Sequence, residues 1–173
     1  MTGRELLLGE WACLGVLAAA PAHGFAVAAR LKPDGDVGRV WSLSRALTYR
    51  ALDQLTALGS VAVVGHEPGT AGGTRTILAA TQEGRTDLGH WLDTPVAHLR
   101  DLRSELLLKL VVAGIVGVDV RPMLTHQRAQ IQQMATTLAE RAAHDGPVDV
   151  VALWRSESAQ AGLRFLDELA RRG

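Results

Sequence analysis

The stretch VWSLSRALTYRALDQLTALGS, residues 40–60, decides how the first half of the chain folds. Its leucines recur near helical spacing, at Leu47, Leu52, Leu55 and Leu58. Ser42 or Ser44 can cap the N-terminus of a helix, and Gly59 is typical of the residue just past a helix C-terminus. The pattern predicts a helix over residues 44–58, with Leu47, Leu52 and Leu55 facing the core.

The segments on either side of this helix complete a small domain. Upstream, apolar residues at helical spacing predict helices over residues 4–20 and 25–31. Downstream, VAVVGHE (61–67) and RTILAAT (75–81) are short β-like runs joined by the turn-rich EPGTAGGT (67–74). Three short helices followed by a hairpin with a glycine-rich tip is the order of a winged helix, a helix-turn-helix variant whose third helix can lie in the DNA major groove.

The second half of the chain is predicted to be almost wholly helical. A helix continues from Gln82, and Thr94-Pro95 ends or kinks it. A turn is predicted at Gly146-Pro147. A seven-residue pattern over two repeats is carried by Leu124, Gln127, Ile131, Met134 and Leu138. It predicts a short packed helix pair, either between two copies of the chain or within a bundle of one copy.

The expected fold is therefore mainly α. An α+β winged helix-turn-helix domain spans residues 1–94, and an all-α dimerisation domain spans residues 95–173. The 173 residues are 47% apolar and 21% charged, which is typical of globular domains and argues against disorder. Eighteen basic residues balance 18 acidic ones, so the strong positive charge of many nucleic-acid-binding domains is absent.

Several classes of protein are disfavoured. Cys13 is the only cysteine, which excludes an intrachain disulfide and a Cys-based zinc site and favours the reducing cytoplasm. Glu5 and Glu10 argue against the alternative of an N-terminal signal peptide, and no apolar run approaches the roughly 18 residues of a membrane span. The six histidines lack metal-ligand spacing, and no nucleophile elbow surrounds Ser156. We expect no enzyme, metal or cofactor.

A helix that reads DNA needs small polar and basic groups at its N-terminal turns. The third helix and the loop before it supply Arg39, Ser42, Ser44, Arg45, Thr48, Tyr49 and Arg50. No acidic residue lies between Gly38 and Ala51. Thr74 and Arg75 follow the glycine-rich tip, where they can touch a phosphate or enter a minor groove. The alternatives are a solvated amphipathic helix and an ordinary hairpin turn.

Over most of residues 14–110 the chain resembles the PadR family of bacterial transcriptional regulators. The matching stretches are LGVLAAAPAHGFAVAARL (14–31), VWSLSRALTYRALDQLTALGSV (40–61), TRTILAATQEGR (74–85) and PVAHLRDLRSELLLKL (95–110). The long segment after Pro95 resembles the branch with a long C-terminal helical domain. The chain departs from the family in carrying Gly59-Ser60-Val61 for Gly-Leu-Ile and Leu78 for the tyrosine of the second strand.

The resemblance implies a homodimeric repressor that binds double-stranded DNA at a pseudo-palindromic operator and is released by a small aromatic effector. It places Ser44, Arg45, Thr48 and Tyr49 at the DNA-facing start of the third helix and Arg75 on the wing. The candidates to line an effector cavity are Trp11, Phe25, Trp91 and Trp154, which otherwise are core residues. The alternative function is a ligand-sensing or protein-binding helical dimer whose winged helix no longer binds DNA.

Overall fold

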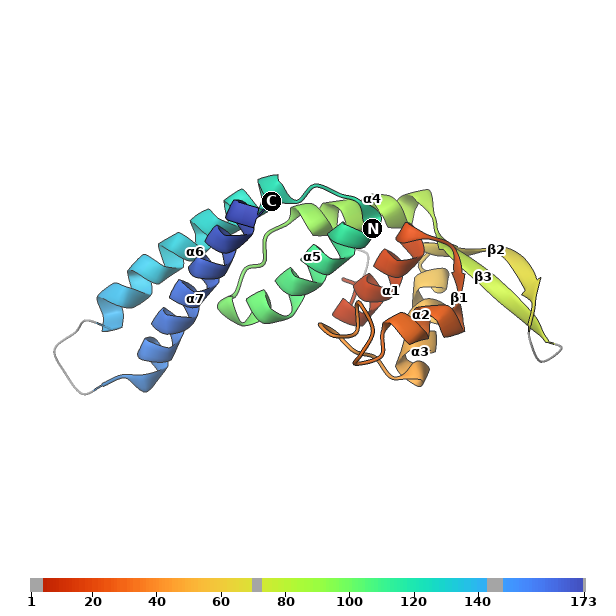
Figure 1. Ribbon diagram of the computed structural model, residues 1–173, viewed down its shortest axis with the longest axis horizontal. Helices are drawn as coiled ribbons and strands as arrows, with labels where there is room; N and C mark the ends of the chain where they lie inside the picture. The colour runs from red at the N-terminus through yellow and green to blue at the C-terminus, as the bar shows by residue number, and fades with distance from the viewer. Residues whose placement is uncertain (1–4, 70–72, 143–147, 173) are drawn as a thin grey trace. The chain divides into compact units, whose positions relative to one another are not determined.

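The computed structural model describes residues 5–69, 73–142 and 148–172 (Figure 1). Arg4, where the first helix was predicted to begin, Gly72 of the hairpin tip and the turn at Gly146-Pro147 lie outside these residues. The chain is mainly helical, as the sequence predicted, and contains a three-stranded antiparallel sheet. None of the described helices is long and apolar enough to cross a membrane.

Contacts between residues divide the chain into two compact units. The first contains the chain up to Leu92 together with Leu107–Val118, and the second contains Asp93–Leu106 and the chain from Asp119 onward. The predicted boundary at residue 94 lies near the first of these divisions, while residues 107–118, predicted in the second domain, group with the first unit. The assignment of domains stays a prediction.

The first unit has the winged-helix order of elements. Its elements are α1 (Leu8–Ala19), β1 (Ala22–His23), α2 (Gly24–Arg30), α3 (Arg45–Ala57), β2 (Val61–Pro68), β3 (Thr74–Ala80) and α4 (Gln82–Asp93), with most of α5 (Glu105–Val116). The sheet has the order β1-β3-β2. Helices α1 and α3 pack together over a core that includes Leu14, Leu17 and Leu55, all fully buried.

The ends of α3 are set by local chemistry. The Ser44 hydroxyl accepts a hydrogen bond from the Leu47 N–H at 3.2 Å, which caps the N-terminus. Gly59 has a positive φ of 77°, and the N–H groups of Gly59 and Ser60 bond the carbonyls of Thr56 and Leu55. This pair of bonds is a Schellman motif, so the predicted cap and terminal glycine are confirmed.

The buried face of α3 differs from the prediction by one residue. Leu52 and Leu55 are buried as expected, but Leu47 is 51% exposed and Thr48 is fully buried. The Thr48 hydroxyl donates to the Ser44 carbonyl at 3.0 Å, so its polar group is satisfied inside the helix. Because residues 48, 52 and 55 share one helix face, a buried threonine at the first of them leaves Leu47 pointing to solvent.

Strand β1 was not predicted. It has two residues and pairs with β3, with Ala22 opposite Leu78 and His23 opposite Ile77. Strands β2 and β3 form the predicted hairpin, which has a register shift between Val63 and Gly65. The short β1 ladder holds the start of α2 beside the hairpin, so that residues of α2 and of the hairpin share one surface.

The second unit is a helical hairpin with a short lead-in. It contains η1 (Leu99–Arg103), a 3₁₀ helix, followed by α6 (Arg121–Ala142) and α7 (Val150–Arg172), which lie side by side (Figure 1). Arg128 on α6 donates to Asp167 on α7, with 2.6 Å between Nε and Oδ1. Gln127 and Ile131 of the predicted stripe are buried within the unit, whereas Leu124, Met134 and Leu138 are half-buried.

Cys13 lies in the core of the first unit. It is fully buried, and burial, with a smaller contribution from the charge of Glu10, raises the pKa of its thiol to about 12. Because the thiolate is the nucleophile, the folded protein should resist alkylation by iodoacetamide at pH 8, and unfolding in urea should restore labelling. Mass spectrometry measures both states. Labelling of the folded protein at the rate seen in urea would contradict the buried placement.

Candidate nucleic-acid interface

A groove of about 890 Å³ lies on the first unit between α3, the start of α2 and the hairpin. Its lining includes His23, Gly24, Phe25, Arg45, Tyr49, Asp53, Thr74 and Arg75. Two arginines from different elements therefore face one concave surface, accompanied by a single carboxylate, Asp53, in the lining. Guanidinium groups in this setting can bind phosphate oxygens or the acceptor edge of guanine.

Arg45, the first residue of α3, is held by two aromatic rings. Its guanidinium carbon lies 5.4 Å from the centroid of the Phe25 ring and 5.8 Å from that of the Tyr49 ring. Both distances are within the range of cation–π attraction. Tyr49 in turn lies against Gly24, where an added Cβ would come within 2.8 Å of the tyrosine Cε1. The first turns of α2 and α3 thus fit closely together.

In the same groove, Arg75 of β3 comes close to His23, whose ring centroid lies 6.3 Å from that of Phe25. The distance between Arg75 Nη1 and His23 Nε2 is 3.5 Å. His23 caps α2, because its Nδ1 accepts a hydrogen bond from the Ala26 N–H at 3.1 Å. A neutral imidazole whose Nδ1 accepts must carry its proton on Nε2. Two donors, Nε2–H and the Arg75 guanidinium, then lie side by side at this wall of the groove.

The remaining predicted DNA contacts have varied placements. Ser42 and Arg50 are exposed, Ser44 is exposed while capping α3, and Thr74 is exposed at the start of β3. Thr48 is buried in the core and does not line the groove. Of the nine candidates, the groove collects Arg45, Tyr49, Thr74 and Arg75.

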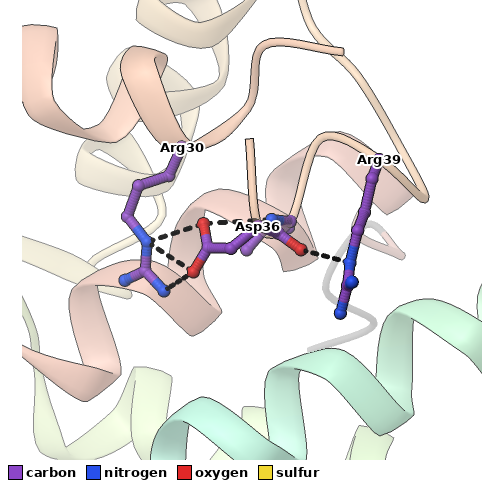
Figure 2. A network of polar contacts seen from close by, with 4 residues as sticks. Arg30, Asp36 and Arg39 are labelled. Atoms are coloured by element: carbon purple, nitrogen blue, oxygen red, sulfur yellow. Dashed lines mark hydrogen bonds and ion pairs between the residues drawn. The ribbon is translucent and has the colours of Figure 1, made fainter. Parts of the chain in front are cut away.

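Arg39 is part of a polar network in the loop between α2 and α3 (Figure 2). Its Nε donates to the Asp36 carbonyl at 3.1 Å. The Asp36 carboxylate binds the Arg30 guanidinium, with Nε 3.0 Å from Oδ1, and the hydrogen bond from Arg30 holds the pKa of Asp36 below its usual value. The network folds the loop that leads into α3, and it ties Arg39 to that loop.

The four aromatic residues considered for an effector cavity are dispersed. Trp11 and Trp91 stack within the first unit, with ring centroids 4.9 Å apart and planes 9° apart. The Nζ of buried Lys109 lies 5.1 Å from the Trp91 centroid. Phe25 lies in the groove with Arg45, and Trp154 is 72% exposed on α7 of the second unit. An effector site lined by these residues stays a prediction.

His23 is the groove residue that sequence reasoning missed. Its sequence context, between Pro21 and Gly24, indicates only a break between two helices, because nothing in a single sequence shows that two residues pair with a distant strand. The signal available was a histidine two residues before the predicted helix start at Phe25, because a side-chain acceptor near a helix N-terminus can cap its first turn.

No protein-family model matches the chain, and comparison with curated proteins finds no match. Solved structures of PadR-type regulators are similar to it. Bacillus subtilis PadR in complex with operator DNA has a TM-score of 0.48 at 17% identity, covering 92% of this chain and 96% of that one. The Vibrio cholerae virulence activator AphA has a TM-score of 0.43 at 21% identity, covering 94% and 92%.

A PadR-like transcriptional regulator from Bacillus cereus has a TM-score of 0.43 at 17% identity, with 99% of each chain covered. At these identities and TM-scores the neighbours carry no argument about the function of this chain.

Proposed function

We propose that the chain is a sequence-specific DNA-binding transcriptional regulator of the PadR type, with α3 and the hairpin as its reading surface. The observation that supports this best is the groove in which Arg45 of α3 and Arg75 of β3 face one concave surface. A winged helix places its third helix in the major groove, and arginines at its start can reach phosphates and base edges. The resemblance of residues 14–110 to the family supports the same function.

The proposal includes a homodimer. Helix α7 and the residue pair before it expose a run of large apolar side chains at Val148, Val150, Val151, Leu153 and Trp154. An exposed apolar face of this kind is typical of an interaction surface. Two copies would present two α3 helices to half-sites about one helical turn, roughly 10 bp, apart on a pseudo-palindrome. Repression and relief by a small aromatic effector are inferred from the family resemblance, and action in the cytoplasm is inferred from the single cysteine.

The second candidate is a helical dimer that binds a ligand or protein and no longer binds DNA. The balanced charge of the chain and the Asp53 carboxylate in the groove favour it. The dependence of binding affinity on salt concentration distinguishes the two functions. Each phosphate contact makes the logarithm of the DNA affinity fall with a slope of about 0.9 against the logarithm of the salt concentration, whereas docking on apolar surface responds little.

Selection from a random pool of DNA duplexes at roughly 0.1 M salt tests the proposal, because nonspecific phosphate binding is damped at that concentration. We expect a pseudo-palindrome to be enriched. Arg45→Ala should then weaken binding to the enriched duplex by about fivefold or more, since a good arginine contact to guanine contributes about 1–3 kcal/mol.

Arg164→Ala is the matched control, because Arg164 is an exposed arginine of α7 in the second unit and its loss removes the same charge. It should leave the affinity for the duplex unchanged. The proposed function is contradicted if folded protein of measured oligomeric state enriches no sequence. The proposed role of α3 is contradicted if Arg45→Ala does not lower the affinity for the enriched duplex.

A further inference from the structure

Phe25 is an exposed aromatic residue in an unusual position. It occupies the first turn of α2, and 53% of its surface is exposed. Its ring contacts the guanidinium of Arg45 on α3. An apolar side chain this exposed contributes little to the core. The main contact of Phe25 on this surface is therefore the one with Arg45.

The contact leaves the arginine able to bind. Cation–π contact with a ring face gives the guanidinium no oxygen or nitrogen acceptor, so its five N–H donors are not used up by a conventional hydrogen bond. Within the residues that the structure describes, the Arg45 guanidinium makes no hydrogen bond and no ion pair. The group is therefore restrained by two rings, Phe25 and Tyr49, while its donors remain available to a ligand in the groove.

We propose that Phe25 is a positioning residue of the nucleic-acid interface, which together with Tyr49 holds the Arg45 guanidinium in the groove before DNA binds. The inference rests on the proposed function and assigns Phe25 to the DNA surface. An arginine side chain loses considerable rotamer freedom when it is fixed in a complex. A guanidinium already restrained by two rings loses less, and the affinity for DNA rises accordingly.

Gly24 has a defined part in this arrangement. A Cβ at this position would come within 2.8 Å of Tyr49 Cε1 and 3.1 Å of Cζ, so the ring of Tyr49 would have to move. Alanine has a higher helix propensity than glycine. Gly24→Ala therefore disturbs the aromatic contact with Arg45 without removing a side chain and without weakening α2.

Four variants test the proposal through their Kd for the duplex enriched from the random pool. Phe25→Leu should weaken binding by about three- to tenfold, and Gly24→Ala should weaken it in the same direction. Phe25→Tyr keeps an aromatic face and should bind within about twofold of the original protein. Phe25→Leu combined with Arg45→Ala should bind no more weakly than Arg45→Ala alone, because Phe25 acts through Arg45.

Nuclear magnetic resonance of the DNA-free protein is the second measurement. The Arg45 Nε–H should show ring-current shifts and restricted motion, and Phe25→Leu should reduce both, leaving the contribution of the Tyr49 ring. If the Arg45 signal responds in this way but Phe25→Leu leaves the Kd unchanged while Arg45→Ala raises it, Phe25 has no positioning role and the proposed function stands. If Phe25→Leu weakens binding equally with and without Arg45, the route through Arg45 is wrong. If the original protein enriches no duplex, both proposals fail.

Discussion

Replacing Gln127 by leucine should lower the free energy of unfolding of the second unit by about 2–6 kcal/mol. Gln127 is fully buried on α6, and its side-chain amide pairs with the backbone of Val96. Oε1 accepts from the Val96 N–H at 2.7 Å, and Nε2 donates to the Val96 carbonyl at 3.1 Å. Leucine has a similar volume but leaves both backbone groups without a partner, and each buried unpaired group costs about 1–3 kcal/mol.

Hydrogen exchange followed by mass spectrometry measures the loss of local stability in peptides from residues 93–106 and from α6. Urea unfolding measures the change in the overall free energy of unfolding. Gln132→Leu is the control, because Gln132 is exposed on the same helix and its replacement should change stability by less than about 0.5 kcal/mol. Equal stability of the two variants would show that the Gln127 amide bonds do not stabilise the unit.

Replacing Gly84 by alanine should destabilise the first unit by about 2–3 kcal/mol. A Cβ at Gly84 would lie 2.2 Å from the Ser60 carbonyl oxygen, which is backbone and cannot turn aside. The same junction is fixed by Thr81, whose hydroxyl accepts from the Gly84 N–H at 3.0 Å and donates to the Gly59 carbonyl at 2.7 Å. Any shift that relieves the clash must therefore disturb the start of α4 and the end of α3 together.

The control for this variant lies on the same helix. Among the residues that the structure describes, and apart from the neighbouring turns of α4 itself, an added Cβ at Gly89 meets no atom within 4 Å, so Gly89→Ala should raise stability by about 0.5–1 kcal/mol through helix propensity. Urea unfolding monitored by circular dichroism compares the two variants. A Gly84→Ala protein as stable as Gly89→Ala would show that Ser60 does not restrict this position.

The features that the sequence predicted well are those that depend on near neighbours in the chain. The cap at Ser44 and the terminal glycine at Gly59 are local chemistry, and both lie where the pattern placed them. The hairpin and the end of α4 before Thr94-Pro95 are also local signals. They are sufficient to indicate a winged helix within a mainly α chain.

The errors arise where distant segments meet. The burial of Thr48 in place of Leu47 depends on the rotation of α3 against α1, which leucine spacing alone does not determine. Strand β1 is too short to show alternation, so the approach of His23 to β3 was not foreseen. For the same reason Phe25 was considered only as a cavity or core residue, although it contacts Arg45 across two helices.

The stacked Trp11 and Trp91 pair gives the first unit an optical signature of its own. Two parallel indoles 4.9 Å apart have coupled electronic transitions, and the Lys109 ammonium 5.1 Å from one ring perturbs them further. Trp154, by contrast, is largely exposed on α7 and emits from an aqueous environment. Near-ultraviolet dichroism of the stacked pair can therefore follow the first unit in the unmodified protein, without an attached dye, whereas emission from an aqueous environment comes from Trp154 of the second unit together with exposed Trp41 of the first.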